Sequence, residues 1–115
     1  SIVRGTTSER IVRLIREAGA TEIHMLVTAP PFLNPCYYGT DVPSREHLIA
    51  CTHTAEEIAK IIGADTVGFL STDAVKLIAA DSNCSHFCDA CFTGEYPTDA
   101  PIPYVNKYQK KISER

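Results

Sequence analysis

The stretch that decides the fold is residues 6–28, which read TTSERIVRLIREAGATEIHMLVT. Its first part predicts a helix with one apolar stripe at helical spacing, formed by Ile11, Leu14, Ile15 and Ala18. We expect this stripe to face a core. Thr6 and Glu9 have the spacing of a capping box, which predicts the start of the helix, and Gly19 predicts its end.

The second part of this stretch predicts a strand over Glu22–Thr28, which Pro30 and Pro31 end. Both faces of this strand are fairly apolar, as is typical of a parallel sheet covered on both sides. The rest of the chain predicts a long loop at 32–43 and a short apolar segment at 66–70. It also predicts three helices, at 44–50, 54–62 and 72–80. Only one strand is clear, and a lone parallel strand has nothing to pair with. The pattern therefore predicts the C-terminal end of an α/β domain.

The composition excludes several classes of function. The chain has 115 residues, of which 44% are hydrophobic and 22% are charged, which predicts at most one ordinary folded domain. A net charge of −3 and a pI of about 5.7 give no general attraction to nucleic acid or anionic lipid. No apolar run approaches the roughly 20 residues that span a bilayer. We therefore expect a soluble, cytoplasmic protein with no nucleic-acid or membrane partner.

The opening residues have the composition of a phosphate-binding loop. Gly5 and three hydroxyl residues, Thr6 to Ser8, stand at the predicted helix N-terminus, and Arg4 adds a positive charge. Free backbone N–H groups and the helix dipole favour an anion at such a place. The alternative interpretation is a simple helix cap that contains an arginine.

Five cysteines are many for a cytoplasmic protein of this size, and their odd number disfavours a closed set of disulfides. Cys84, Cys88 and Cys91 form a tight cluster, with Cys36 in a distant loop as a further candidate ligand. These four could hold zinc, or three of them could hold an iron–sulfur cluster with a fourth ligand from elsewhere. Unligated thiols are the third possibility, and Cys51 is best interpreted as a small apolar residue.

Several blocks of the chain resemble, in order and spacing, those of the amidophosphoribosyltransferase family. They are Ser1–Ser8, Pro30-Pro31, Pro35–Gly39 with Asp41, Ile62–Asp65 with Leu70-Ser71, and Cys88–Pro97. The resemblance extends over essentially the whole chain, and its last block is highly specific. It implies an α/β fold, the C-terminal part of a type I, Rossmann-like phosphoribosyltransferase domain with a mostly helical C-terminal extension. The division would fall between 1–40, which carries the phosphate loop, and 41–115, which carries most of the cysteines.

The resemblance also implies the roles of particular residues. The 5-phosphate of phosphoribosyl pyrophosphate (PRPP) would be bound by Ser1, Arg4, Gly5, Thr6 and Thr7. A 4Fe-4S cluster, present in one branch of the family, would be held by Cys36, Cys88 and Cys91. Cys84 does not match a family ligand. The aspartates that engage Mg2+, the fourth cluster cysteine and the glutaminase domain would precede Ser1, so we expect a C-terminal fragment that is inactive alone.

The activity implied for the whole enzyme is the conversion of glutamine and PRPP to 5-phosphoribosylamine, glutamate and pyrophosphate. This is the first committed step of de novo purine biosynthesis. Purine nucleotides would act as feedback inhibitors, and the enzyme would assemble as a homo-tetramer. Two functions of other classes stay open from the residues themselves: a zinc-binding interaction module, and a regulatory domain that binds a nucleotide without catalysis.

Overall fold

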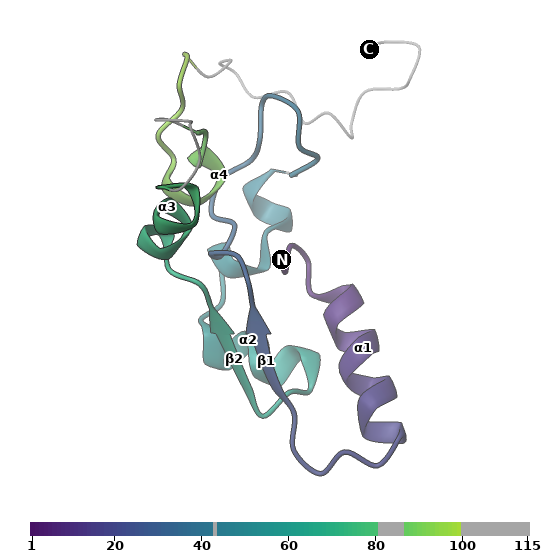
Figure 1. Cartoon of the computed structure of the whole chain (residues 1–115). Helices are drawn as coiled ribbons and strands as arrows, with labels where there is room; N and C mark the ends of the chain where they lie inside the picture. The colour runs from purple at the N-terminus through teal and green to yellow at the C-terminus, as the bar shows by residue number, and fades with distance from the viewer. Residues whose placement is uncertain (43, 81–86, 100–115) are drawn as a thin grey trace.

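The computed structural model describes residues 1–42, 44–80 and 87–99 (Figure 1). Its helices and strands, in chain order, are α1 (Thr6–Glu17), β1 (His24–Val27), α2 (Ala55–Ile62), β2 (Thr66–Phe69), α3 (Thr72–Ala80) and α4 (Ala90–Thr93). Two short 3-10 helices, η1 (Arg45–His47) and η2 (Ile49–Cys51), lie between β1 and α2. In the described part of the chain, no helix has the length and apolar character needed to cross a membrane.

β1 and β2 form a parallel sheet, in which His24 lies opposite Thr66 and Val27 opposite Phe69. The prediction of a single clear strand is therefore wrong, because the apolar segment predicted at 66–70 is its partner. β2 has only four residues, and Gly68 interrupts its apolar pattern, which weakens the strand signal. The glycine has a packing role: a Cβ there would lie 3.3 Å from Cδ2 of Leu26 on the neighbouring strand.

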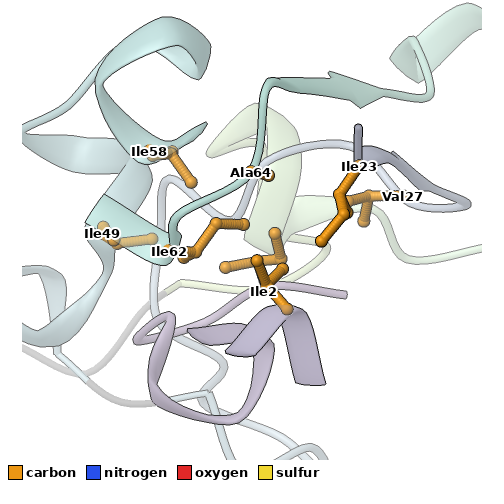
Figure 2. Close-up of a cluster of buried hydrophobic side chains, with 8 residues drawn as sticks. Ile2, Ile23, Val27, Ile49, Ile58, Ile62 and Ala64 are labelled. Carbon is orange, nitrogen blue, oxygen red and sulfur yellow. The ribbon is translucent and has the colours of Figure 1, made fainter. Parts of the chain in front are cut away.

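The core lies between the sheet, α1 and α2 (Figure 2). Its buried members are Ile2, Val12, Ile23, Val27, Ile49, Ile58, Ile62 and Ala64. Ile58 and Ile62 lie one turn apart on α2, so both point to the same side of the helix. Each isoleucine buried here stabilises the fold by about 1.5–3 kcal/mol relative to an exposed one.

The predicted ends of α2 are confirmed. The side chain of Thr54 accepts the N–H of Glu57, and the carboxylate of Glu57 accepts the N–H of Thr54 at 2.8 Å, which completes a capping box. Gly63 ends the helix in the left-handed conformation, with φ of 79°. A Cβ on Gly63 would lie 3.7 Å from Val12, which shows how closely α1 approaches this end of α2.

The predicted orientation of α1 is wrong. Its buried residues are Ser8 and Val12, whereas Ile11, Leu14 and Ile15 are 46%, 60% and 42% exposed. The helix carries apolar residues on two sides, and helical spacing alone does not determine which side meets α2. Leu26 of β1 is also 82% exposed, so the described residues leave apolar surface on α1 and on the sheet uncovered.

Two other local predictions are wrong as well. The segment predicted as a helix at 44–50 forms η1 and η2, because Leu48 between them is extended (φ −91°, ψ 109°) and buries its side chain in a second cluster with Phe32 and Val42. At α1, none of the described side chains makes a capping hydrogen bond, and the N-cap is Gly5 rather than Thr6.

An ion pair ties the far end of α1 to the sheet. Arg16 contacts a carboxylate oxygen of Asp65 at 2.6 Å, and the same oxygen accepts the N–H of Ile23 at 2.7 Å. The Ile23 N–H, followed by the Arg16 side chain, holds the pKa of Asp65 below its usual value. The end of α1, the start of β1 and the turn after α2 therefore meet at one carboxylate.

Candidate functional site

The predicted phosphate loop lines a cavity of about 430 Å³. Its lining is formed by Ser1 to Ser8 and Asp41. All five predicted phosphate-binding residues, Ser1, Arg4, Gly5, Thr6 and Thr7, are therefore brought together at one cavity. In Figure 1 this N-terminal loop lies near the end of β1 at which the arrowhead points. Ligands of open α/β sheets commonly bind beyond the carboxyl ends of the strands.

Buried contacts hold the loop at Ser1–Ser8 against the core. Ile2 is only 4% exposed and belongs to the core, and the carbonyl of Val3 accepts the N–H of Ile49 at 2.9 Å. Gly5 is buried in the left-handed conformation, with φ of 86°. A Cβ on Gly5 would lie 3.0 Å from Cδ1 of Ile49, which is closer than ordinary van der Waals contact. Glycine is required here by both its backbone angle and its surroundings.

The start of α1 is electrically suited to an anion. The carbonyl of Gly5 accepts the N–H of Glu9 at 2.9 Å, which closes the first helical turn. Since none of the described side chains caps this end, the first-turn N–H groups keep their capacity to bind a ligand. Thr6 and Thr7 are exposed beside them, as is Arg4. Donors, hydroxyls, a guanidinium and the positive end of the helix dipole thus converge on one cavity.

Asp41 lines the same cavity but was not among the predicted site residues. It comes from the loop between β1 and η1, which folds back over the start of the chain. Its position in the sequence, between Gly39 and Val42 in a breaker-rich loop, carries no spacing relative to residues 1–8 that could have shown this. Only the tertiary fold brings the carboxylate to the loop.

The cysteines predicted to bind a cluster lie on two segments that are docked against each other. Leu33 and Asn34 donate their backbone N–H groups to the carbonyl of Cys91, each at 3.0 Å, and Phe32 stacks on Phe92 with ring centroids 5.1 Å apart. Cys36 and Cys91 are half-buried against the Phe32 cluster, and Cys88 is exposed. Cys84 lies outside the described residues.

The electrostatics of these thiols are linked. Partial burial raises the pKa of Cys36, but the backbone N–H groups of Tyr38, Thr40 and Gly39 together lower it below the usual value. Burial, followed by the charge of Cys36, raises the pKa of Cys91. Within 1–42, 44–80 and 87–99, no three histidine, cysteine or acidic side chains converge closely enough to hold a single metal ion.

Cys51 packs against the same buried cluster as Cys36 and Cys91, but it is not one of the predicted cluster ligands. It is half-buried against the Phe32 cluster, and its thiol donates to the carbonyl of Leu33 at 3.3 Å. This contact satisfies the weak S–H donor inside an apolar environment. The interpretation of Cys51 as a small packing residue agrees with that geometry.

Comparison with known proteins shows close relatives. The chain is 52% identical to the amidophosphoribosyltransferase of Bacillus subtilis over 93% of its own length and 24% of that protein. It is 47% identical to the amidophosphoribosyltransferase of Archaeoglobus fulgidus over 88% of its length and 22% of that protein. The chain is homologous to amidophosphoribosyltransferase. No protein-family model matches it.

The amidophosphoribosyltransferase fold is shared as well as the sequence. A solved structure of glutamine PRPP amidotransferase from B. subtilis, complexed with ADP and GMP, matches 96% of this chain with a TM-score of 0.80 at 50% identity. This confirms the α/β, phosphoribosyltransferase-type fold. The chain spans 25% of that structure and about a quarter or less of the amidophosphoribosyltransferases that it matches in sequence.

Proposed function

We propose that this chain supplies the 5-phosphate-binding part of an amidophosphoribosyltransferase. The whole enzyme would convert glutamine and PRPP to 5-phosphoribosylamine, glutamate and pyrophosphate. The observation that carries the proposal is the cavity at the uncapped start of α1, in a chain about 50% identical to PRPP amidotransferase. Neither the zinc-binding module nor the non-catalytic regulatory domain has a comparable observation in its favour.

The proposed roles follow from the chemistry of each group. The first-turn N–H groups and the hydroxyls of Thr6 and Thr7 donate to phosphate oxygens, and Arg4 balances their charge. Gly5 lets the backbone curve closely around the anion, and Ser1 completes the loop. The phosphate is remote from the ribose carbon that reacts, so these contacts contribute binding energy that holds this carbon in place.

Charge stabilisation at the reacting carbon is proposed to come from other parts of the enzyme. Mg2+ would neutralise the departing pyrophosphate, with its ligands mostly outside this chain. The glutaminase domain would supply ammonia. Asp41 lies at the same cavity as the loop, so its carboxylate would repel a misplaced phosphate and favour a ligand whose hydroxyl groups face it.

The cysteines fit a 4Fe-4S cluster better than a single ion. Although partial burial raises it, the pKa of the Cys36 thiol is held below its usual value by three nearby backbone N–H groups, which favours the thiolate form that binds metal. Burial, followed by the charges of Cys36 and then Cys88, raises the pKa of Cys91, and bound iron would relieve the repulsion between these thiolates. A cluster places each thiolate on a separate iron, so its ligands need not converge as tightly as those of one ion. The cluster would supply a structural cross-link, with a fourth ligand from outside the described residues.

We further propose the regulatory and cellular setting of this enzyme. The B. subtilis relative was solved with ADP and GMP, which supports purine nucleotides as feedback inhibitors here. A homo-tetramer, a cytoplasmic location and the division of the chain into 1–40 and 41–115 complete the proposal. β1 and β2 pair across that division, so both parts would contribute to one sheet.

The test is an assay of the complete native polypeptide. We expect glutamine-dependent release of pyrophosphate from PRPP, together with glutamate in equal amount. A matched variant, Arg4→Gln, keeps the loop length but removes the charge and is expected to raise KM for PRPP. A native protein that binds PRPP but releases no pyrophosphate would support the non-catalytic regulatory domain instead. One zinc ion per chain, without PRPP binding, would support the zinc-binding module.

A further inference from the structure

The two segments that carry the proposed cluster ligands are joined by backbone hydrogen bonds and by contacts between aromatic rings. The backbone hydrogen bonds from Leu33 and Asn34 to Cys91 fix one end of the junction. The stacked rings of Phe32 and Phe92, which neighbour Leu33 and Cys91 in the chain, add a second contact at this end. These contacts fix the position of the Cys36 loop relative to the Cys91 segment.

Tyr96 closes the other end of this junction. Its hydroxyl donates to the carbonyl of Pro35 at 2.7 Å, directly before Cys36 in the chain. Its ring meets that of Tyr37, directly after Cys36, with centroids 5.0 Å apart. Pro35 is buried, and Tyr96 and Tyr37 are half-buried. One side chain from the Cys91 segment thus contacts the residues on both sides of Cys36.

We propose that Tyr96 is a positioning residue for the cluster ligands, holding the Cys36 loop against the Cys91 segment. This inference rests on the proposed iron–sulfur cluster. The hydroxyl and the ring of Tyr96 have separate roles. The hydroxyl fixes the position of the two segments at Pro35, while the ring packs against Tyr37, the residue that follows Cys36. Loss of either group loosens the loop and speeds the release of iron.

The experiment uses the complete native polypeptide, purified without oxygen, in two variants. Tyr96→Phe removes only the hydrogen bond to Pro35, whereas Tyr96→Leu also removes the aromatic contact. Thr66→Val is the control, since it removes a hydroxyl that bonds to Nδ1 of His24 at 2.8 Å on the sheet, outside the two segments. The readout is the decay of iron–sulfur absorbance in excess iron chelator, with bound iron per chain and the electron paramagnetic resonance signal of the reduced cluster.

We expect Tyr96→Phe to lose iron about two- to tenfold faster than wild type, the range for one neutral hydrogen bond. Tyr96→Leu should lose iron faster still, and Thr66→Val should match wild type. Equal rates for Tyr96→Phe and wild type would overturn the proposal, even if Tyr96→Leu failed to fold. A general loss of stability, with melting temperature lowered equally in iron-free and iron-loaded protein and no change in iron release, would also overturn it.

The result for Tyr96 can be distinguished from the result for the proposed reaction. A wild-type protein that holds iron but makes no phosphoribosylamine would refute the reaction and still decide the role of Tyr96. A wild-type protein that transfers ammonia but binds no iron would overturn the cluster and the role of Tyr96 together, and would leave the reaction standing.

Discussion

Gly5→Val and Gly5→Ala test the phosphate loop at its tightest point. Gly5 has φ of 86°, a conformation that costs an L-residue roughly 1–2 kcal/mol and is an outlier for a β-branched side chain. The first added carbon would also lie 3.0 Å from Cδ1 of Ile49, where carbon atoms usually pack at about 3.5–4.0 Å. Alanine introduces both effects in mild form, and valine adds two methyl groups to the same space.

The size of the effect follows from what the loop must do to relieve this strain. If residue 5 leaves the left-handed region, the N–H groups at the start of α1 turn away from the cavity. Each hydrogen bond to a charged phosphate contributes about 1.5–3 kcal/mol. Losing one such bond would raise KM for PRPP by roughly ten- to 150-fold. The strain is smaller than the roughly 5–15 kcal/mol that stabilises an ordinary domain, so the protein should still fold.

The assay measures KM for PRPP and, separately, glutamine hydrolysis in the complete native polypeptide. Gly19→Ala is a matched control, because Gly19 has a similarly positive φ of 102° but no atom within 4 Å of the added Cβ. We expect KM to rise in the order Gly5→Ala, then Gly5→Val, with glutamine hydrolysis intact in both and KM unchanged in Gly19→Ala. An unchanged KM in both Gly5 variants would refute the assignment of the phosphate loop.

Three further predictions concern the acid response, the cluster and the core. The folded-state pKa of Asp65 is lowered, so its contribution to stability is present above the unfolded pKa of about 4 and is lost as pH falls through the folded value. Hydrogen exchange at the Ile23 amide should therefore be faster in Asp65→Asn than in wild type at pH 7, with a difference that shrinks below about pH 4; equal exchange at pH 7 would contradict this. Cys88→Ser should abolish iron–sulfur absorbance while Cys84→Ser leaves it unchanged, and loss of iron in both would mean that the ligands are misassigned. Ile58→Ala should lower the opening free energy of α2, measured by hydrogen exchange, by about 2–5 kcal/mol because Ile58 is buried. The control Ile61→Ala, at an exposed position, should change it by less than about 0.5 kcal/mol.

The parts of the fold that the sequence predicts well are those specified by neighbouring residues. Thr54 and Glu57 are close enough in the chain to form the capping box of α2 on their own, and Gly63 ends the helix through its own backbone freedom. The buried face of α1 is different, because it depends on Val12 meeting the end of α2, which lies about 50 residues away in the sequence. Likewise, β2 becomes a strand by pairing with β1 rather than through a strong pattern of its own.

The candidate site divides in the same way. The residues of the phosphate loop are contiguous, so their types and order predict the site that the cavity at Ser1–Ser8 supports. Asp41 could not be predicted from spacing, because a loop of the tertiary fold carries it to the cavity. Tyr96 was missed for a related reason: its hydrogen bond to Pro35 spans 61 positions of the chain. Short-range patterns predict a loop that binds through its own backbone, whereas junctions between distant segments need the folded structure.

The one local rule that fails at the site is informative about function. Thr6 and Glu9 repeat the spacing of Thr54 and Glu57, yet only the second pair forms a capping box. The difference lies in the preceding residue: Gly5 takes the left-handed conformation and gives its carbonyl to Glu9, so the helix begins at Thr6 and the threonine cannot cap it. Leaving a helix uncapped costs about 0.5–2 kcal/mol. A cap would have occupied N–H groups that a phosphate can use, so a bound phosphate would offset this cost at α1, whereas α2 keeps its capping box.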